Sequence, residues 1–413
     1  KNEKKLKGVI LISSKKTFLA GGDIDMLFSI SDPEEAFKIS QFGKKWMLEF
    51  ENLGVPTVAA LNGHALGGGM ELALACHYRI SLNNPKIKFG FPEVTLGLLP
   101  GGGGITRLVR LIGLEKSMPF LLEGNQVRPD EAIQEGLIHD TALDLEDLLK
   151  KSREWIFKNP NSEQPWHKLK AKIPGGSPQN PSLAQKLIFA PILLLKKSWG
   201  HYPASKAIMA SAVEGCMVDF ETASRIESRA FAEVVTSKEC KNILKVNWYQ
   251  LNKIGQGLSR PKGVPPKDTK KVGVLGAGMM GHGITYASAL SGIETIMIDK
   301  NEAILKKGYQ KIESILEEGF KKGKINEEKR EQVLSKIKCA TDVSTLKDCD
   351  LIIEAVTEDR TVKAKITEEV ESYTDNVGVF ASNTSTLPIT SLARVSKKPE
   401  NFVGLHFFSP VHK

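Results

Sequence analysis

The stretch from Val58 to Cys76 constrains the fold most, because a short apolar run breaks into glycines and then resumes with helical spacing. This pattern predicts a strand, a tight loop and a buried helix. Gly67, Gly68 and Gly69 leave the backbone uncovered, so a ligand atom can approach N–H groups at the helix N-terminus, where the helix dipole favours negative charge. Glu71 follows within the apolar segment, where a carboxylate is expected to be perturbed or functional.

Two further segments add a second carboxylate and more glycine turns. Glu93 lies 22 residues after Glu71, between a proline and an apolar run, and glycines 101–104 follow it. Upstream, the sequence AGGDI at residues 20–24 supplies another glycine turn after an apolar run. Either glutamate alone is equally well explained as a surface carboxylate. Three glycine turns and two glutamates in apolar surroundings rarely occur together by chance.

These segments resemble the crotonase (enoyl-CoA hydratase) superfamily. The resemblance is carried by residues 20–24, by NGHALGGGME at 62–71, and by Pro92-Glu93 with LGLLPG at 96–101. It implies a crotonase-like ββα domain in which the N–H groups of Gly22 and Gly68 hold the thioester oxygen as it becomes an enolate. It also implies that Glu71 and Glu93 deliver a hydroxyl to C3 and a proton to C2 of an enoyl-CoA. Members with other chemistry usually lack one glutamate, so the pair favours a hydratase.

Size and composition set broad limits. A chain of 413 residues, 41% of them hydrophobic, is long enough for two or three domains. The net charge of +9 suits polyanions such as coenzyme A and dinucleotides, but the lysines are scattered, and no basic patch with interleaved aromatic residues indicates nucleic acid. The five cysteines form no C-x-x-C pair and no metal-ligand spacing, which is typical of a reducing compartment.

The middle of the chain predicts connecting helices. Composition shifts to Pro, Gly, Asn and Ser between about 159 and 182, which indicates a boundary. A helical region follows, in which Ile226, Ala230 and Val234 predict one buried stripe. The longest apolar run, Leu187–Leu195, is too short to span a bilayer, so membrane association is not indicated. We therefore predict a first domain over 1–160, a linker with connecting helices over 161–268, and a last domain over 269–413.

The last domain begins with a glycine motif. The G-x-G-x-x-G pattern of Gly276, Gly278 and Gly281 follows an apolar strand and opens a helix, and Asp299 stands at a strand end 18 residues after Gly281. Gly276 makes the turn, Gly278 lets a pyrophosphate approach the backbone, and Gly281 allows helix and strand to pack closely. Asp299 would accept the ribose hydroxyls and repel a 2′-phosphate, so this pattern predicts a Rossmann-type doubly wound domain that prefers NAD to NADP.

With IEAV at 353–356, ASNTST at 381–386 and GLHFFSP at 404–410, this segment resembles L-3-hydroxyacyl-CoA dehydrogenase from about Lys270 onward. The resemblance places His406 on the catalytic base and Ser385 beside the substrate hydroxyl and the nicotinamide. Monofunctional dehydrogenases commonly carry asparagine where Ser409 stands. The further positions that the resemblance assigns to cofactor contacts are Met280, Asp299, Val356, Thr357, Glu358, Lys363 and Ser409.

A hydratase followed by a dehydrogenase resembles the multifunctional fatty-acid β-oxidation proteins. This implies an α/β enzyme that hydrates trans-2-enoyl-CoA and oxidises the product with NAD, acting on acyl-CoA thioesters beside a thiolase subunit. An enoyl-CoA isomerase and a non-catalytic acyl-CoA-binding scaffold for a thiolase stay open as alternatives. The resemblance also implies truncation at both ends, with a glutamate partner of His406 and a helical domain beyond the chain. A bacterial cytoplasm is favoured, and the mitochondrial matrix or a peroxisome stays open.

Overall fold

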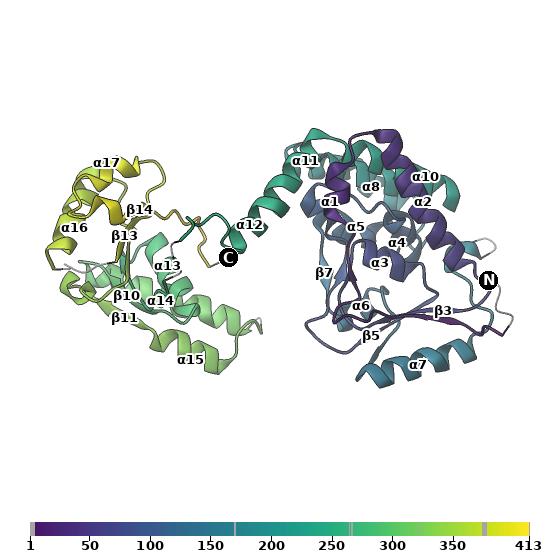
Figure 1. Ribbon diagram of the computed structural model, residues 1–413, viewed down its shortest axis with the longest axis horizontal. Helices are drawn as coiled ribbons and strands as arrows, with labels where there is room; N and C mark the ends of the chain where they lie inside the picture. Colours follow the sequence, from purple (N-terminus) through teal and green to yellow (C-terminus); the bar gives the residue numbers. More distant parts are fainter. Residues whose placement is uncertain are drawn as a thin grey trace. The chain divides into compact units, whose positions relative to one another are not determined.

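A computed structural model describes residues 5–168, 171–263, 265, 267–321, 323–373 and 378–412. The chain divides into two compact units, Lys1–Pro261 and Lys262–Lys413 (Figure 1). Both are α/β folds, as predicted, and each has its own sheets and hydrophobic cores. Among the described residues, no helix has both the length and the apolar character needed to cross a membrane.

The first unit contains a parallel sheet that is covered on both faces. Its strand order is β1 (Val9–Leu11), β3 (Thr57–Leu61), β5 (Tyr78–Leu82) and β8 (Asp140–Ala142). Every residue of β3 is buried. Its alternate residues enter two different cores, because helix α7 (Leu145–Lys158) packs on one face of the sheet while the main core of the unit lies on the other.

A second sheet positions the glycine turns. It consists of β2 (Leu19–Ala20), β4 (Ala65–Leu66), β6 (Phe89–Gly90) and β7 (Gln126–Val127), of which only β7 runs antiparallel to its neighbour. The first three strands lead into α1 (Ile24–Ser29), α3 (Gly68–Leu74) and the 3₁₀ turn η1 (Pro92–Leu96). Because carboxyl ends of parallel strands meet at one sheet edge, the three predicted motifs converge there.

Helices form the rest of the first unit. They are α2 (Pro33–Glu51), α4 (Gly104–Ile112), α5 (Leu114–Glu123), α6 (Pro129–Gln134), η2 (Pro165–His167), α8 (Pro181–Ser198), α9 (Pro203–Gly215), α10 (Phe220–Val235), α11 (Lys238–Leu244), the π-helical turn η3 (Lys245–Gln250) and α12 (Leu251–Gly255). Pro129 is the first residue of α6 and Gly136 follows its end, the positions where helices most often carry proline and glycine.

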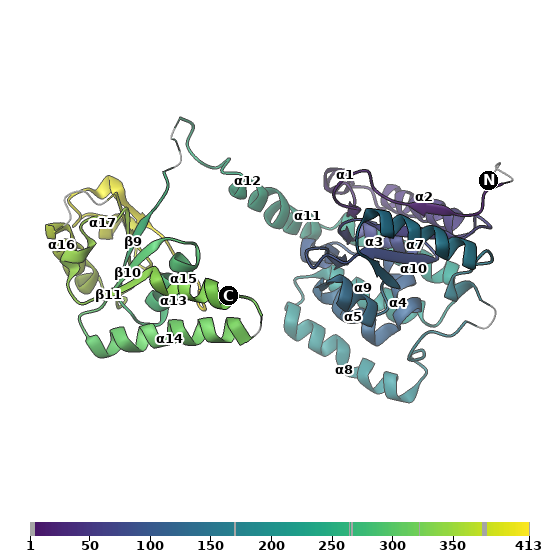
Figure 2. The same ribbon diagram turned by 90° about the horizontal axis from the view of Figure 1, so that it is seen from below.

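Residues 161–268, predicted as a connecting region, do not form a unit of their own. Helices α9, α10 and α11 contribute Ile208, Phe231 and Leu244 to the main core of the first unit. Helix α8 lies along α5, where Lys186 and Lys197 each form a 2.7 Å ion pair with a glutamate of α5 (Figure 2). The structural boundary therefore falls at Pro261, within the segment 255–270, which is rich in glycine, proline and lysine.

The buried face of α10 is displaced from the predicted stripe. Val234 is buried, but Ile226 and Ala230 are only partly buried. The centre of the buried face carries Ala223, Glu227, Ser228, Phe231 and Val235. The apolar pattern misplaced the face because two polar residues, Glu227 and Ser228, lie in its middle, where α10 packs between α2 and α9.

The second unit is a doubly wound sheet of six parallel strands. The spatial order is β11 (Ile337–Ala340), β10 (Glu294–Ile298), β9 (Lys271–Leu275), β12 (Leu351–Glu354), β13 (Val379–Ser382) and β14 (Phe402–Gly404). Numbered from β9, this is the order 3-2-1-4-5-6 of dinucleotide-binding folds, in which the ligand crevice opens at the switch between β9 and β12. The prediction of a Rossmann-type fold is confirmed.

Both faces of this sheet are covered by helices. The consecutive residues Ile352 and Ile353 of β12 point to opposite faces of the sheet and belong to different cores. One face carries α13 (Met279–Leu290), α14 (Glu302–Lys321) and α15 (Glu327–Ser335), whereas the other carries η4 (Val343–Leu346) and α16 (Arg360–Tyr373). Helix α17 (Ile389–Ala393) and η5 (Pro399–Asn401) join the last two strands. The predicted strand over 377–382 begins at Val379, and Val377 lies outside the described residues.

Candidate active sites

A cavity of about 870 Å³ in the first unit collects the residues of the crotonase-like motifs. Gly22, Gly68, Glu71 and Glu93 all line it, although they come from three separate strand ends. Most of the remaining lining is apolar, with side chains from α1, α2, η1 and α10. The structure thus brings together every residue that the sequence assigns to hydration, in a cavity whose lining is mostly apolar.

Glycines at the wall of this cavity leave open the space that a larger side chain would occupy. A Cβ on Gly67 would lie 2.6 Å from Oε1 of Glu93, and Gly67 has a φ of +54°. A Cβ on Gly68 would lie 3.6 Å from the backbone nitrogen of Gly22, so the two expected oxyanion donors are close neighbours. Gly68 is also the first residue of α3, where backbone N–H groups lack partners within the helix.

Glu71 is buried, and the backbone holds its carboxylate. Oε1 of Glu71 accepts hydrogen bonds from the N–H groups of Gly102 at 2.7 Å and Gly104 at 2.8 Å. Burial and the nearby charge of Glu227 raise the pKa of Glu71 to about 7, against the two amides and Lys44, which lower it. Near neutral pH this carboxyl therefore exchanges a proton readily.

Glu93 differs from Glu71 in its surroundings. Among the described residues, its buried Oε2 has no hydrogen-bond partner. Burial raises the pKa of Glu93 well above its usual range, and the charge of Glu71 raises it further. Both carboxyls therefore resist ionisation, and Glu71 has two amide donors that stabilise its ionised form, whereas Oε2 of Glu93 has none among the described residues.

Two charged residues of this site were not predicted from the sequence. Glu227 of α10 and Lys44 of α2 are buried and lie 3.0 Å apart as an ion pair beside the glycine loop at 101–104. A signal for Lys44 exists, because it follows Ala36 and Ser40 at four-residue spacing on the buried face of α2. The sequence offers no comparable signal for Glu227, since its contact with the loop joins segments 124 residues apart.

The region predicted as connecting helices also lines the cavity. Trp248 of η3 and Leu251 of α12 are among the lining residues, as is Phe231 of α10. Tyr249 of η3 fixes this segment by donating to a carboxylate oxygen of Asp25 at 2.6 Å. The cavity that holds Glu71 and Glu93 is thus completed by residues beyond the predicted first domain.

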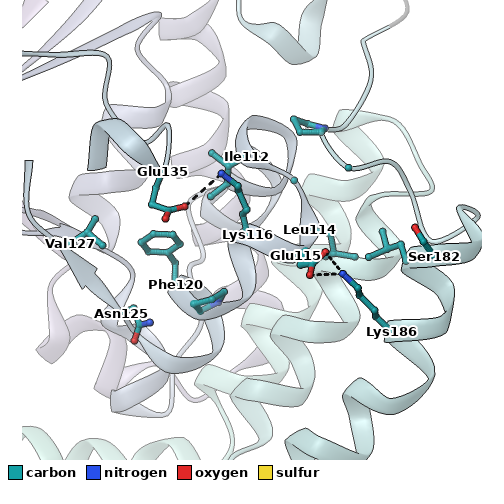
Figure 3. Close-up of a pocket in the computed structure, with 15 residues that line it drawn as sticks. Ile112, Leu114, Glu115, Lys116, Phe120, Asn125, Val127, Glu135, Ser182 and Lys186 are labelled. Atoms are coloured by element: carbon teal, nitrogen blue, oxygen red, sulfur yellow. Dashed lines mark hydrogen bonds and ion pairs between the residues drawn. The ribbon is translucent and has the colours of Figure 1, made fainter. Parts of the chain in front are cut away.

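A second cavity, of about 750 Å³, lies between α4, α5 and α8 (Figure 3). Two ion pairs flank it, Glu115–Lys186 at 2.7 Å and Lys116–Glu135 at 3.9 Å. Its lining includes none of the predicted site residues. The chemistry of the first unit is therefore assigned to the cavity that holds Glu71 and Glu93.

The glycine motif of the second unit fits a dinucleotide. Gly276 has a φ of +97°, and a Cβ there would lie 2.8 Å from the carbonyl oxygen of Ala355. A Cβ on Gly281 would collide with the carbonyl oxygen of Gly276, so helix α13 packs against the turn only because this residue is glycine. Nothing lies within 4 Å of a Cβ built on Gly278. That open side at the helix N-terminus is where a pyrophosphate would be held.

Asp299 stands directly after β10, beside this loop. One carboxylate oxygen accepts from the N–H of Ala277 at 3.0 Å, and the other accepts from the N–H of Asn301 at 3.0 Å. The neighbouring Lys300 does not pair with Asp299, because its Nζ forms an ion pair with Glu369 at 2.6 Å. The acid therefore lies at the place where ribose hydroxyls would bind, and no cation among the described residues is paired with it.

Ser385 and His406 meet at the carboxyl ends of β13 and β14. The Oγ of Ser385 lies 3.1 Å from Nε2 of His406, and both residues are exposed. The backbone N–H of Phe407 donates to Oδ1 of Asn383 at 2.7 Å, which joins the segments that carry the two residues. The predicted base and its neighbour are thus within hydrogen-bond reach of each other.

A network of charged groups supports this edge. Burial would raise the pKa of Glu358, but hydrogen bonds from Thr384, Ser385 and Thr386 lower it to about 2. Lys363 is buried and pairs with Glu358 at 3.3 Å and with Glu354, a residue the sequence reading did not select, at 2.9 Å.

The structure gives the positions of the other residues that were predicted to contact the cofactor. Met280 is partly buried in α13, Val356 and Thr357 follow β12, and Ser409 is exposed beyond β14. Their roles as cofactor contacts stay predictions. Among the described residues, no group of three or more His, Cys, Asp or Glu side chains is arranged to hold a metal ion.

Fold and geometry define two classes of domain, an acyl-thioester site of crotonase type and a dinucleotide-binding unit. Residues 1–173 match the family model described as enoyl-CoA hydratase/isomerase, and residues 271–413 match that of the 3-hydroxyacyl-CoA dehydrogenase NAD binding domain. The two matches follow each other along the chain, and together they correspond to the domain composition of multifunctional enoyl-CoA hydratase/3-hydroxyacyl-CoA dehydrogenases. The predictions of crotonase-type and NAD-binding domains are confirmed.

Similar proteins carry both domains in one chain. The fatty acid oxidation complex subunit alpha of Shewanella frigidimarina is 36% identical over 417 residues, and that of Shewanella sp. strain ANA-3 is 34% identical over 417 residues. Each alignment covers 100% of this chain and 58% of the relative, so the chain spans less than two thirds of the length of these proteins. A solved structure, (S)-3-hydroxybutyryl-CoA dehydrogenase PaaH1 from Ralstonia eutropha, is 38% identical over 35% of this chain and 51% of that chain, with a TM-score of 0.34.

Proposed function

We propose that the protein hydrates trans-2-enoyl-CoA to (S)-3-hydroxyacyl-CoA and oxidises this product with NAD to 3-oxoacyl-CoA. These are two consecutive steps of fatty-acid β-oxidation. The observation that carries the first half is the pair Glu71 and Glu93 in one cavity, in contrasting surroundings. One glutamate can take a proton from a water held between them, and the other can then donate a proton to the substrate.

The hydration step assigns each group a role. Ionised Glu71 takes a proton from water as the water oxygen bonds to C3 of the enoyl thioester. The electron pair of the double bond moves onto the thioester oxygen, which the N–H groups of Gly22 and Gly68 stabilise. Neutral Glu93 then gives its proton to C2, so the two carboxyls exchange protonation states and the elements of one water are added.

The oxidation step uses the edge at β13 and β14. NAD, when bound, supplies the acceptor for the hydride that leaves C3 of the hydroxyacyl thioester. His406 takes the proton of the C3 hydroxyl, and Ser385, 3.1 Å from Nε2 of His406, orients the ring and the hydroxyl. Gly276, Gly278 and Gly281 with Asp299 would hold the dinucleotide, and Glu358 fixes the backbone of Ser385.

Two alternatives concern the first cavity. An enoyl-CoA isomerase moves a double bond with one carboxylate, and a scaffold binds the thioester without turnover. The perturbed surroundings of both glutamates favour the hydratase over either alternative, because neither alternative requires a second buried acid.

The test is hydration of crotonyl-CoA by the parent chain and by Glu71→Gln and Glu93→Gln. Each variant should lose about 10²- to 10⁴-fold in kcat, the range for loss of a general acid or base. Glu35→Gln, at an exposed position of α2, is the matched control and should match the parent. Unchanged hydration in either buried variant would refute the assignment. A 3-enoyl-CoA substrate turned over faster than crotonyl-CoA would favour the isomerase, and thioester binding without turnover would favour the scaffold.

Partners and location extend this proposal. The relatives are named as subunits of a complex, which supports association with a further subunit, and the product 3-oxoacyl-CoA is the substrate class of a thiolase. We propose such a thiolase subunit as the partner. The similar chains in Shewanella support a bacterial cytoplasmic location, and co-purification of a thiolase with the tagged native protein would test the association.

A further inference from the structure

Glu227 is a completely buried acid that the reaction itself does not use. It lies in α10, and its exposed fraction is 0%. Its Oε1 accepts from the N–H of Gly103 at 2.7 Å, and its Oε2 accepts from the N–H of Thr106 at 2.8 Å and the hydroxyl of Thr106 at 2.7 Å. It does not line the cavity that holds Glu71 and Glu93. These three hydrogen bonds all come from one segment, the loop that enters α4 and the first turn of that helix.

Successive N–H groups of this loop alternate between two carboxylates. The N–H groups of Gly102 and Gly104 donate to Glu71, and the N–H of Gly103 between them donates to Glu227. Gly103 has a φ of +103°, a conformation that glycine adopts without strain. Adjacent peptide planes share a Cα, so holding the Gly103 N–H restricts the orientations of the neighbouring N–H groups that hold Glu71.

Helix α2 completes the support of the loop. Lys44 is 5% exposed, pairs with Oε1 of Glu227 at 3.0 Å and donates to the carbonyl oxygen of Ser224 at 2.7 Å. Ser40, one turn earlier, donates to the carbonyl oxygen of Gly101 at 2.6 Å. Burying the charge of Glu227 without Lys44 would be costly, so the pair functions as one unit.

We propose that the Glu227–Lys44 pair is a positioning device of the hydration site, which holds the loop at 101–104 so that its amides orient Glu71 for proton transfer. This inference rests on the proposed hydratase function. Glu227 acts through Glu71 and touches no reacting atom, so it is a positioning residue. The device explains why residues of α10, outside the predicted first domain, are needed for a site built from the first 104 residues.

The charged groups around Glu227 determine how its replacement changes the pKa of Glu71. Facing it are Lys44 of α2, Glu71 of α3, Glu93 of η1, and Arg107 and Arg110 of α4. The charge of Glu227 raises the pKa of Glu71, and Lys44 lowers it by less. Replacing Glu227 with neutral glutamine therefore lowers the pKa of Glu71, whether or not Lys44 stays protonated. This shift reports the loss of the charge of Glu227, whereas the positioning role is reported by a fall in kcat with KM little changed.

The experiment compares the parent chain with Glu227→Gln in crotonyl-CoA hydration across pH. We expect kcat to fall by about 10- to 100-fold, the effect of misplacing a catalytic group, with KM little changed. We also expect the low-pH limb of the kcat profile, which reports ionisation of Glu71, to move to lower pH. Glu221→Gln removes an exposed carboxylate from the same helix and should match the parent in both respects.

A second variant covers the case in which Glu227→Gln does not fold. Lys44→Met/Glu227→Gln removes both charges, leaves the interior neutral and should show the same shift of the low-pH limb. Folding of each variant is checked by circular dichroism. A folded variant that keeps the kcat of the parent, with or without a change in KM, overturns the inference. An inactive parent chain instead removes the proposed function, and with it the basis of this inference.

Discussion

The hydroxyl of Ser385 lies 3.1 Å from Nε2 of His406, and the register of two parallel strands produces this contact. β13 pairs with β14 so that Ser382 lies opposite Gly404. Ser385 and His406 follow these partners by three and two residues, at the same edge of the sheet. A slip of one residue in this pairing would turn His406 toward the other face and separate the two groups.

His406→Ala should abolish oxidation and spare cofactor binding. Without the imidazole no group at this position takes the hydroxyl proton, so 3-hydroxybutyryl-CoA oxidation should fall by about 10²- to 10⁴-fold. The glycine motif that would hold NAD lies after β9, away from this change. NADH formation by the whole natural protein and NADH fluorescence on binding are the two measurements. His201→Ala, in the first unit, is the control, and full oxidation by His406→Ala would exclude the histidine as the base.

Asp299→Ala should weaken NAD binding and reduce the preference for NAD over NADP. A hydrogen bond to a charged group contributes about 1.5–3 kcal/mol, so NAD affinity should fall by about 10- to 100-fold. The affinity for NADP should fall less, because the substitution also removes the repulsion between the Asp299 carboxylate and the 2′-phosphate. Titration with NADH and NADPH measures both. Lys300→Ala is the matched control, since that lysine pairs with Glu369. If Lys300→Ala weakens NAD binding as much as Asp299→Ala, the assignment of Asp299 is wrong.

The sequence predicts those parts of the protein whose chemistry is local. The glycine motif at 276–281 requires a turn, an open approach and close packing within a few residues, and the structure has all three. Asp299 is likewise predicted by its place at a strand end. The motifs around Glu71 and Glu93 are also local, and their convergence follows from parallel strands ending at one edge.

Contacts between distant segments could not be predicted. The Glu227–Lys44 pair joins α10 to α2, and the cavity-lining Trp248 comes from the region predicted as a linker with connecting helices. Helix α8 carries the apolar run Leu187–Leu195, yet side chains such as Ile192 are exposed, at 63% for that residue. Apolar periodicity shows which residues can be buried, but the partner surfaces that decide burial are set by the tertiary fold.

Gly68→Ala should fold and lose hydration. A Cβ at this position would lie 3.6 Å from the backbone nitrogen of Gly22, which is an ordinary van der Waals contact, and φ is not in the left-handed region. The methyl group would nevertheless occupy the space between the two N–H donors, so kcat should fall by about 10²- to 10³-fold, as for loss of one oxyanion donor. Crotonyl-CoA hydration and thermal unfolding measure the two properties. Gly255→Ala, with open space around its Cβ, is the control. A fully active Gly68→Ala would move the oxyanion site elsewhere.

The raised pKa of Glu71 should make the first unit less stable as pH rises. Burial raises the pKa of Glu71 from 4.5 to about 7, so between these values the native state binds more protons than the unfolded state. The free energy of unfolding should therefore fall across this window and level off above it, with about 3 kcal/mol assigned to Glu71. Glu71→Gln removes this contribution, and its unfolding free energy should fall less between about pH 5 and about pH 8.

Tryptophan fluorescence in denaturant isolates this effect, because all five tryptophans lie within Lys1–Pro261. Glu146→Gln, at an exposed position in the first turn of α7, should follow the pH dependence of the parent. If Glu71→Gln and the parent lose stability equally as pH rises, Glu71 is already ionised at low pH in the folded protein. The buried acid would then have an ordinary pKa, and its assignment as the group that takes up the proton of water near neutral pH would fail.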